Sequence, residues 1–258
     1  MITAAPLAGR VVLITGASRG IGAAVAAGLA ARGARVIIGY EPRADRATEA
    51  AAVQTKITEA GGTAITLPAD LSDPAQVAEL VRRSGEAWDR LDVVIANAAA
   101  SGRVDWRTLS VADWDRVQQV NVRGTFLLAQ QSHPWLLRAA APSFVAVTSV
   151  MAETGQPGAV HYTASKAAII GLVRALAREL GPDGIRVNAV MPGAIRTEDE
   201  LDQFPDPATI DPEILAVQAV PRRGLATDLV GAFAFLAGDD SAFVTGQVIN
   251  VDGGWVLR

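Results

Sequence analysis

Two patterns of apolar and polar positions alternate along this chain from one end to the other. Short apolar runs are typical of buried strands, and the longer stretches between them, with apolar positions every three to four residues, are typical of helices. The predicted strands are Val11–Thr15, Arg35–Gly39, Ala64–Pro68, Leu91–Ala96, Phe144–Ser149, Arg186–Met191 and Gln247–Val251. The predicted helices are Ile21–Arg32, Arg43–Ala60, Pro74–Trp88, Val111–Leu137, Ala159–Leu180 and Thr227–Leu236.

This succession of strand and helix predicts an α/β fold, because parallel strands need a crossover connection and a helix usually provides it. We expect a Rossmann-type, doubly wound and mostly parallel sheet of seven strands, with helices on both faces. No linker or change of composition divides residues 1–258, so a single domain is expected. The one long irregular stretch, residues 193–223, is rich in proline and acidic residues. Long loops in compact domains are commonly binding loops, so it is the expected substrate loop, with a solvated excursion as the alternative.

Composition excludes several classes of function. Half of the residues are hydrophobic and 19% are charged, which excludes a disordered chain. A net charge of −4 argues against a nucleic-acid or anionic-membrane partner. Without cysteine there is no disulfide or thiol nucleophile, and the two histidines are too far apart to suggest a metal site. Neither a signal peptide nor a membrane-spanning stretch is apparent, so we expect a cytoplasmic protein.

A glycine-rich turn follows the first predicted strand directly and opens the first predicted helix. It runs Thr15-Gly-Ala-Ser-Arg-Gly-Ile-Gly22. Glycines allow a tight turn and close backbone approach, and the free N–H groups at a helix N-terminus bind phosphate. The turn therefore predicts a dinucleotide site that includes Gly16, Ser18, Arg19, Gly20, Ile21 and Gly22.

The end of the second strand bears on the choice between NADP and NAD. An acidic residue there would bind the ribose hydroxyl of NAD, but Tyr40 occupies that place. Arg19 and Arg43 are placed to meet the 2′-phosphate of NADP. Glu41 would instead repel a phosphate if it pointed inward. The basic residues favour NADP, with NAD as the alternative.

Tyr162 and Lys166 stand out because the chain has only two tyrosines and two lysines, against 21 arginines. On a helix, positions i and i+4 share a face, so the phenol is expected to lie beside the ammonium. A nearby positive charge favours the phenolate and lowers the phenol pKa toward neutrality. The pair predicts a proton donor and acceptor.

These motifs together resemble the short-chain dehydrogenase/reductase family over essentially the whole chain, most closely its branch of 3-oxoacyl-carrier-protein reductases. The matching motifs are Thr15–Gly22, Asp70-Leu71-Ser72, Asn97-Ala98-Ala99, Asn121-Val122-Arg123-Gly124, Ser149, Tyr162-x-x-x-Lys166, Pro192-Gly193 and Val251-Asp252-Gly253-Gly254. The resemblance implies a dinucleotide-binding oxidoreductase domain.

The resemblance also implies roles for further residues. Asp70 and Leu71 would contact the adenine, and Asn97 with its neighbours Ala98 and Ala99 would pass under the two riboses. Lys166 would bind the nicotinamide ribose, while Ile195 and Thr197, after Pro192 and Gly193, would hold the carboxamide. Asn121 would hold a water that links Lys166 to solvent. A homotetramer assembled through the regions 111–137 and 159–180 and the C-terminal strand is implied as well.

We therefore expect an NAD(P)(H)-dependent oxidoreductase that interconverts a ketone and a secondary alcohol on a small-molecule substrate. Tyr162 would donate or accept the proton, and Ser149 would stabilise the developing charge on the substrate oxygen. The alternative is a catalytically silent protein that senses dinucleotides on the same fold.

Overall fold

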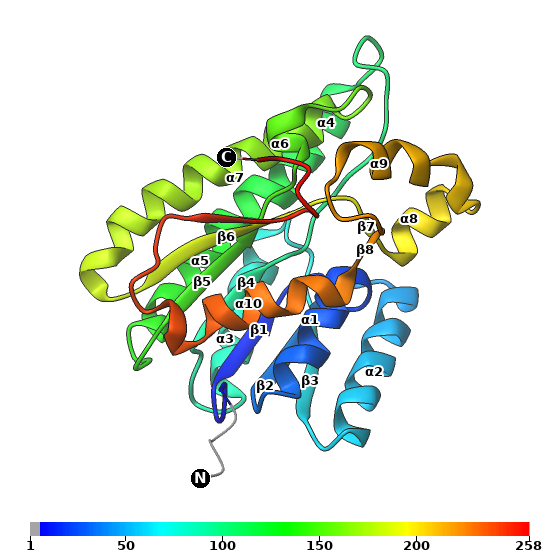
Figure 1. Cartoon of the computed structure of the whole chain (residues 1–258). Coiled ribbons are helices and arrows are strands. Elements are labelled where there is room, and N and C mark those ends of the chain that lie inside the picture. The colour runs from blue at the N-terminus through cyan, green and yellow to red at the C-terminus, as the bar shows by residue number, and fades with distance from the viewer. Residues whose placement is uncertain (1–5, 258) are drawn as a thin grey trace.

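A computed structural model describes residues 6–257, and Figure 1 shows a central sheet enclosed by helices. The sheet contains β1 (Val11–Ile14), β2 (Arg35–Tyr40), β3 (Thr63–Pro68), β4 (Val93–Ala96), β5 (Ser143–Val147), β6 (Arg186–Pro192) and β9 (Val248–Val251). The α-helices are α1 (Gly20–Ala30), α2 (Ala44–Glu59), α3 (Pro74–Glu86), α4 (Val111–Gln118), α5 (Gly124–Leu136), α6 (Met151–Thr154), α7 (Val160–Leu180), α8 (Glu198–Gln203), α9 (Asp211–Val217) and α10 (Val230–Ala237). Short 3-10 turns cover Gly181–Asp183, Pro207–Thr209, Ala226–Leu229 and Asp239–Ser241.

The seven strands lie in the order β3-β2-β1-β4-β5-β6-β9, and every neighbouring pair is parallel. The order reverses direction between β1 and β4, which is the topological switch point of a doubly wound sheet. The α/β fold and the seven-stranded sheet predicted above are confirmed.

The helices cover both faces of the sheet, so two apolar layers form. Along β1, Val12 and Ile14 face the layer that contains α1, α2 and α10, while Val11 and Leu13 face the layer of α3, α5 and α7. Strands buried on both faces have no polar face, which is why they read as unbroken apolar runs in the sequence.

The expectation of one irregular stretch over residues 193–223 was wrong. This segment contains α8, α9 and a parallel two-stranded ribbon of β7 (Ile195–Arg196) and β8 (Gly224–Leu225). An ion-pair cluster holds it together: the Arg223 side chain, 5% exposed, pairs with Glu200 at 2.6 Å and with Asp211, which also pairs with Arg196. The order comes from charges that meet only in the folded protein, so hydrophobic periodicity gives no sign of it.

A second difference concerns the predicted helix over residues 111–137. The chain is helical throughout, but a π-helical turn at Gln119–Arg123 separates α4 from α5. Such turns insert an extra residue into a helix and are frequent at functional sites. Here the turn carries Asn121.

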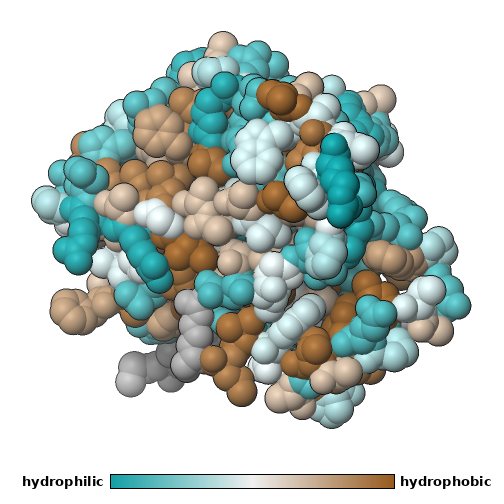
Figure 2. Space-filling view, turned by 90° about the horizontal axis from the view of Figure 1, so that it is seen from above, coloured by the Kyte–Doolittle hydropathy of each residue, from teal (hydrophilic) through white to brown (hydrophobic). Residues whose placement is uncertain are grey.

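The carboxyl ends of the strands meet on the upper side of the molecule in Figure 1, and Figure 2 looks down on that side. Hydrophobic and hydrophilic surface are mixed there. Among the described residues, no helix is both long and apolar enough to cross a membrane.

Candidate active site

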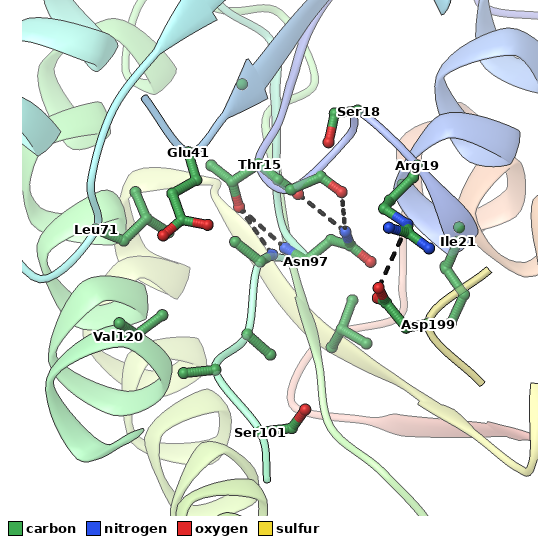
Figure 3. A pocket seen from close by; sticks show the side chains of 18 of the residues that line it. Thr15, Ser18, Arg19, Ile21, Glu41, Leu71, Asn97, Ser101, Val120 and Asp199 are labelled. Atoms are coloured by element: carbon green, nitrogen blue, oxygen red, sulfur yellow. Dashed lines mark hydrogen bonds and ion pairs between the residues drawn. The ribbon is translucent and has the colours of Figure 1, made fainter. Parts of the chain in front are cut away.

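A cavity of about 420 Å³ opens where the strand order reverses, along the carboxyl ends of β1 and β4. Ligands of doubly wound folds bind at this point because the crossover helices leave it in opposite directions. Among the described residues, every predicted site residue except Arg43 and Asn121 lines the cavity. Figure 3 shows part of this lining, which comes from segments far apart in the sequence.

The glycine turn leaves no room for a side chain at Gly16 or Gly22. Gly16 and Gly20 have φ angles of +63° and +58°, which favour glycine. A Cβ on Gly16 would lie 2.7 Å from the Ala98 Cα, and one on Gly22 would lie 2.3 Å from the Gly16 carbonyl oxygen. Arg19, the N-cap residue of α1, makes no capping bond with its own side chain. A helix N-terminus at the end of a close backbone turn fits the pyrophosphate of a dinucleotide.

Asn97 braces this turn from the neighbouring strand. Its side-chain amide donates to the carbonyl oxygens of Thr15 and Gly16, at 2.9 and 3.0 Å. The Thr15 hydroxyl oxygen accepts from the backbone N–H groups of Asn97 and Ala98 in return. Figure 3 shows these bonds linking the ends of β1 and β4. The amide of Asn97 thus fixes the shape of the cavity floor.

The residues after β2 differ in part from the prediction. Tyr40 and Glu41 line the cavity, but Arg43 does not: its guanidinium pairs with Asp45 at 2.8 Å and with Glu41 at 3.4 Å. The basic residue of α2 that lines the cavity is Arg46. The sequence points to Arg43 because it is the first arginine after the strand, but Arg46, about one helical turn further along, is the one that lines the cavity.

Ser149, Tyr162 and Lys166 meet at the other end of the cavity. Ser149 and Tyr162 line the same part of the cavity, and the Ser149 hydroxyl lies close enough to the phenol to affect its pKa. The Lys166 ammonium lies 5.6 Å from the centre of the Tyr162 ring and donates to the Val147 carbonyl oxygen at 2.8 Å. Thr148 ties β5 to α7 through a 2.7 Å bond from its hydroxyl to the Lys166 carbonyl oxygen. Neither Val147 nor Thr148 was singled out from the sequence, since main-chain partners leave no pattern in it.

Burial sets the protonation of this cluster. It raises the pKa of Tyr162, and the neighbouring Ser149 hydroxyl opposes that rise. Burial lowers the pKa of Lys166 from 10.5 to about 8. Both shifts have one cause: a low-dielectric site disfavours the phenolate and the ammonium alike. The expectation that the phenol pKa lies below its ordinary value was therefore wrong for this arrangement, in which the ammonium is hydrogen-bonded to a carbonyl group.

Asn121 lies behind the cluster, with only 1% of its surface exposed. Its amide accepts from the Ala100 N–H at 2.7 Å and donates to the Ala100 carbonyl oxygen and to the Ser165 hydroxyl, both at 2.9 Å. Ser165 in turn donates to the Tyr162 carbonyl oxygen at 2.7 Å. The π-helical turn therefore connects the loop after β4 with the helix that carries Tyr162.

Thr197 occupies the start of α8, where its hydroxyl oxygen accepts from the Glu200 N–H at 3.4 Å. A hydroxyl that accepts in this way still has its hydrogen to donate. Its placement beside Gly193 and Ile195 in the lining fits a carboxamide group.

The glycine turn at the topological switch point is typical of a dinucleotide-binding protein, and comparison with known proteins identifies the family. The profile of the family described as enoyl-(acyl carrier protein) reductase matches residues 16–256. The chain is 35% identical to a 3-oxoacyl-[acyl-carrier-protein] reductase of Synechocystis sp. over 97% of this chain and 98% of the relative. It is 37% identical to an NADPH-dependent aldehyde reductase-like chloroplastic protein of Arabidopsis thaliana, over 97% and 96%.

Solved structures agree with the sequence relatives. A short chain dehydrogenase from Burkholderia cenocepacia in complex with NADP superposes with a TM-score of 0.88, at 36% identity, over 97% of this chain and 99% of that one. A blue fluorescent protein from a metagenomic library in complex with NADPH gives 0.89, at 35% identity, over 98% and 100%. The chain belongs to the short-chain dehydrogenase/reductase family of oxidoreductases, in the branch of the 3-oxoacyl-[acyl-carrier-protein] reductases. Its cofactor is a nicotinamide dinucleotide.

Proposed function

We propose that this protein is an NADP(H)-dependent ketoreductase, which interconverts a ketone and a secondary alcohol. The observation that carries the proposal is the meeting of Ser149, Tyr162 and Lys166 in the lining of one cavity. Two hydroxyl groups in the same part of the lining can both reach one substrate oxygen, as carbonyl reduction requires. The nicotinamide supplies the hydride when the cofactor is bound.

Tyr162 is the proposed proton donor. As negative charge develops on the substrate oxygen, the phenol gives up its proton and the Ser149 hydroxyl stabilises the same oxygen. The raised pKa of Tyr162 keeps the phenol protonated before the reaction, which suits the reductive direction. In the oxidative direction Tyr162, as the phenolate, accepts the proton of the alcohol, and Ser149 stabilises the same oxygen.

Lys166 and Asn121 support this proton transfer. With a pKa of about 8, Lys166 still holds its charge at neutral pH, and it offsets the charge left on Tyr162. The proposed water relay through Asn121 draws support from its place in the π-helical turn next to α7. Its bonds to Ala100 and Ser165 add a positioning role, because they fix the helix turn that carries Tyr162.

The preference for NADP is also a proposal. Arg19 and Arg46 both line the cavity, as Tyr40 does, and Glu49 contacts both arginines, at 3.5 and 2.7 Å. Their guanidinium groups suit a 2′-phosphate, whereas Glu41 in the same lining opposes it. Turnover with NADPH and NADH at equal concentrations tests the preference, and faster turnover with NADH contradicts it.

Substrate class is tested by following NADPH absorbance with a panel of a 3-oxoacyl thioester, a simple ketone, an aldehyde and an enoyl thioester. We expect oxidation of NADPH with a carbonyl compound and none with the enoyl thioester. Turnover of the enoyl thioester alone would contradict the proposal. Tight NADPH binding without turnover across the panel would instead support a silent dinucleotide sensor.

A cytoplasmic location and a homotetramer complete the proposal. The outer surfaces of α4, α5 and α7 carry exposed apolar residues, among them Val111, Phe126 and Val160. Apolar surface of this kind is typical of subunit contacts.

A further inference from the structure

The acidic residues of α8 lie against the phosphate-binding part of the cofactor cavity. The Glu198 carboxylate accepts a hydrogen bond from the Gly20 N–H at 3.0 Å. Gly20 is the first residue of α1, so this N–H belongs to the helix terminus that would receive the pyrophosphate. A carboxylate of the chain itself is therefore bound to an N–H group of the glycine turn that could bind a phosphate.

Arg19, the residue before Gly20, forms ion pairs with further carboxylates of α8. Its guanidinium pairs with Asp202 at 2.8 Å and with Asp199 at 3.3 Å, and Glu49 of α2 contacts it at 3.5 Å. Figure 3 shows Asp199 and Arg19 pointing toward each other on one side of the site. Three carboxylates thus contact Arg19, and one of them, Glu49, also pairs with Arg46. The carboxylates still outnumber the guanidinium groups, so an incoming phosphate would meet a net negative environment.

The contacts of Glu198, Asp199 and Asp202 are weak individually, but each places a carboxylate on a group that would bind the cofactor phosphates. The side chains of Asp199 and Asp202 are 70% and 72% exposed, and exposed ion pairs contribute little to stability. A dinucleotide phosphate, with more charge and more acceptor oxygens, can displace them. The opposite side of α8 is held elsewhere, through Glu200 and the buried Arg223.

We propose that Glu198, Asp199 and Asp202 form an acidic latch that competes with the cofactor phosphates for the Gly20 N–H and for Arg19. The latch lowers the affinity for the dinucleotide and lowers it most for a 2′-phosphate. Cofactor binding opens the latch and thereby releases one side of α8 in the predicted substrate loop. The part that concerns the 2′-phosphate rests on the proposed role of Arg19, whereas the part that concerns Glu198 does not.

The test is equilibrium titration of the purified full chain with NADPH and with NADH, without substrate. Glu198→Gln removes the competing charge at the Gly20 N–H, and the double variant D199N/D202N removes the charges at Arg19. Glu213→Gln is the matched control, because it neutralises an exposed carboxylate of α9 in the same loop. Equal Tm values for all four proteins establish that the substitutions leave the fold intact.

The latch predicts that Glu198→Gln lowers the Kd for both dinucleotides by about threefold, as expected for loss of one exposed competing contact. D199N/D202N should lower the Kd for NADPH by about tenfold and leave that for NADH within about twofold. Equal tightening for both dinucleotides in D199N/D202N would support the latch while excluding Arg19 as the 2′-phosphate ligand. Kd values no lower than those of Glu213→Gln would overturn the latch, whichever substrate the enzyme uses.

Discussion

At the scale of single residues, burial acts on Tyr162 and Lys166 in opposite directions. It raises the pKa of the phenol and lowers that of the ammonium, so both neutral forms gain at the expense of the charged ones. At neutral pH the phenol is neutral in both the folded and the unfolded chain, so of this proposed catalytic pair only the buried ammonium of Lys166 costs stability. Because Lys166 has only 3% of its surface exposed, this cost can be measured as a pH dependence of the free energy of unfolding.

The lysine contributes a specific pH dependence to stability. Folded Lys166 loses its proton above pH about 8, whereas the unfolded chain keeps it until about pH 10.5. In that window the unfolded state binds more protons, so the contribution of this group to the free energy of unfolding rises with pH. Between pH 7 and pH 10 the wild type should gain about 2 kcal/mol relative to Lys166→Met.

Urea unfolding of both proteins at the two pH values measures this gain, with Lys56→Met, at the exposed lysine of α2, as the control for loss of a lysine. A stability difference between wild type and Lys166→Met that stays constant from pH 7 to pH 10 would contradict the lowered pKa.

At the scale of elements, we propose that the glycine turn between β1 and α1 decides whether the cofactor fits. Gly22→Ala would place a Cβ 2.3 Å from the Gly16 carbonyl oxygen and 2.8 Å from the Ala17 Cα, so the backbone of the turn must move. We expect the Kd for NADPH to rise at least about tenfold, because the pyrophosphate depends on close backbone approach.

The matched control is Gly171→Ala on α7, where a new Cβ meets nothing within 4 Å. It should leave the Kd unchanged and stabilise the helix slightly. Titration with NADPH distinguishes the two variants, and equal affinity in both would refute this account of the turn.

At the scale of the whole molecule, the exposed apolar residues of α4, α5 and α7 predict self-association. Sedimentation equilibrium should give four times the mass of one chain, because two kinds of contact are needed to cover both the helices and the C-terminal strand. A single species with the mass of one chain would contradict the tetramer.

The fold could be predicted from the sequence because strands buried on both faces and amphipathic helices leave a local hydrophobic pattern. The cavity lining was also largely predictable, since its residues follow strand ends. What could not be predicted depends on contacts between distant residues: the order of the segment 193–223 around Arg223, and the meeting of Glu198 with Gly20. Arg43 and Arg46 show a third limit, because the helix turn and the local ion pairs decide which guanidinium reaches the cavity.

The central claim is that Tyr162 supplies the proton for carbonyl reduction. Turnover of Tyr162→Phe with NADPH and the best carbonyl substrate of the panel, beside its Kd for NADPH, tests this most directly. We predict that turnover falls by at least about 100-fold while the Kd changes by less than about twofold, because only the hydroxyl group is lost. Turnover close to that of the wild type would contradict the claim.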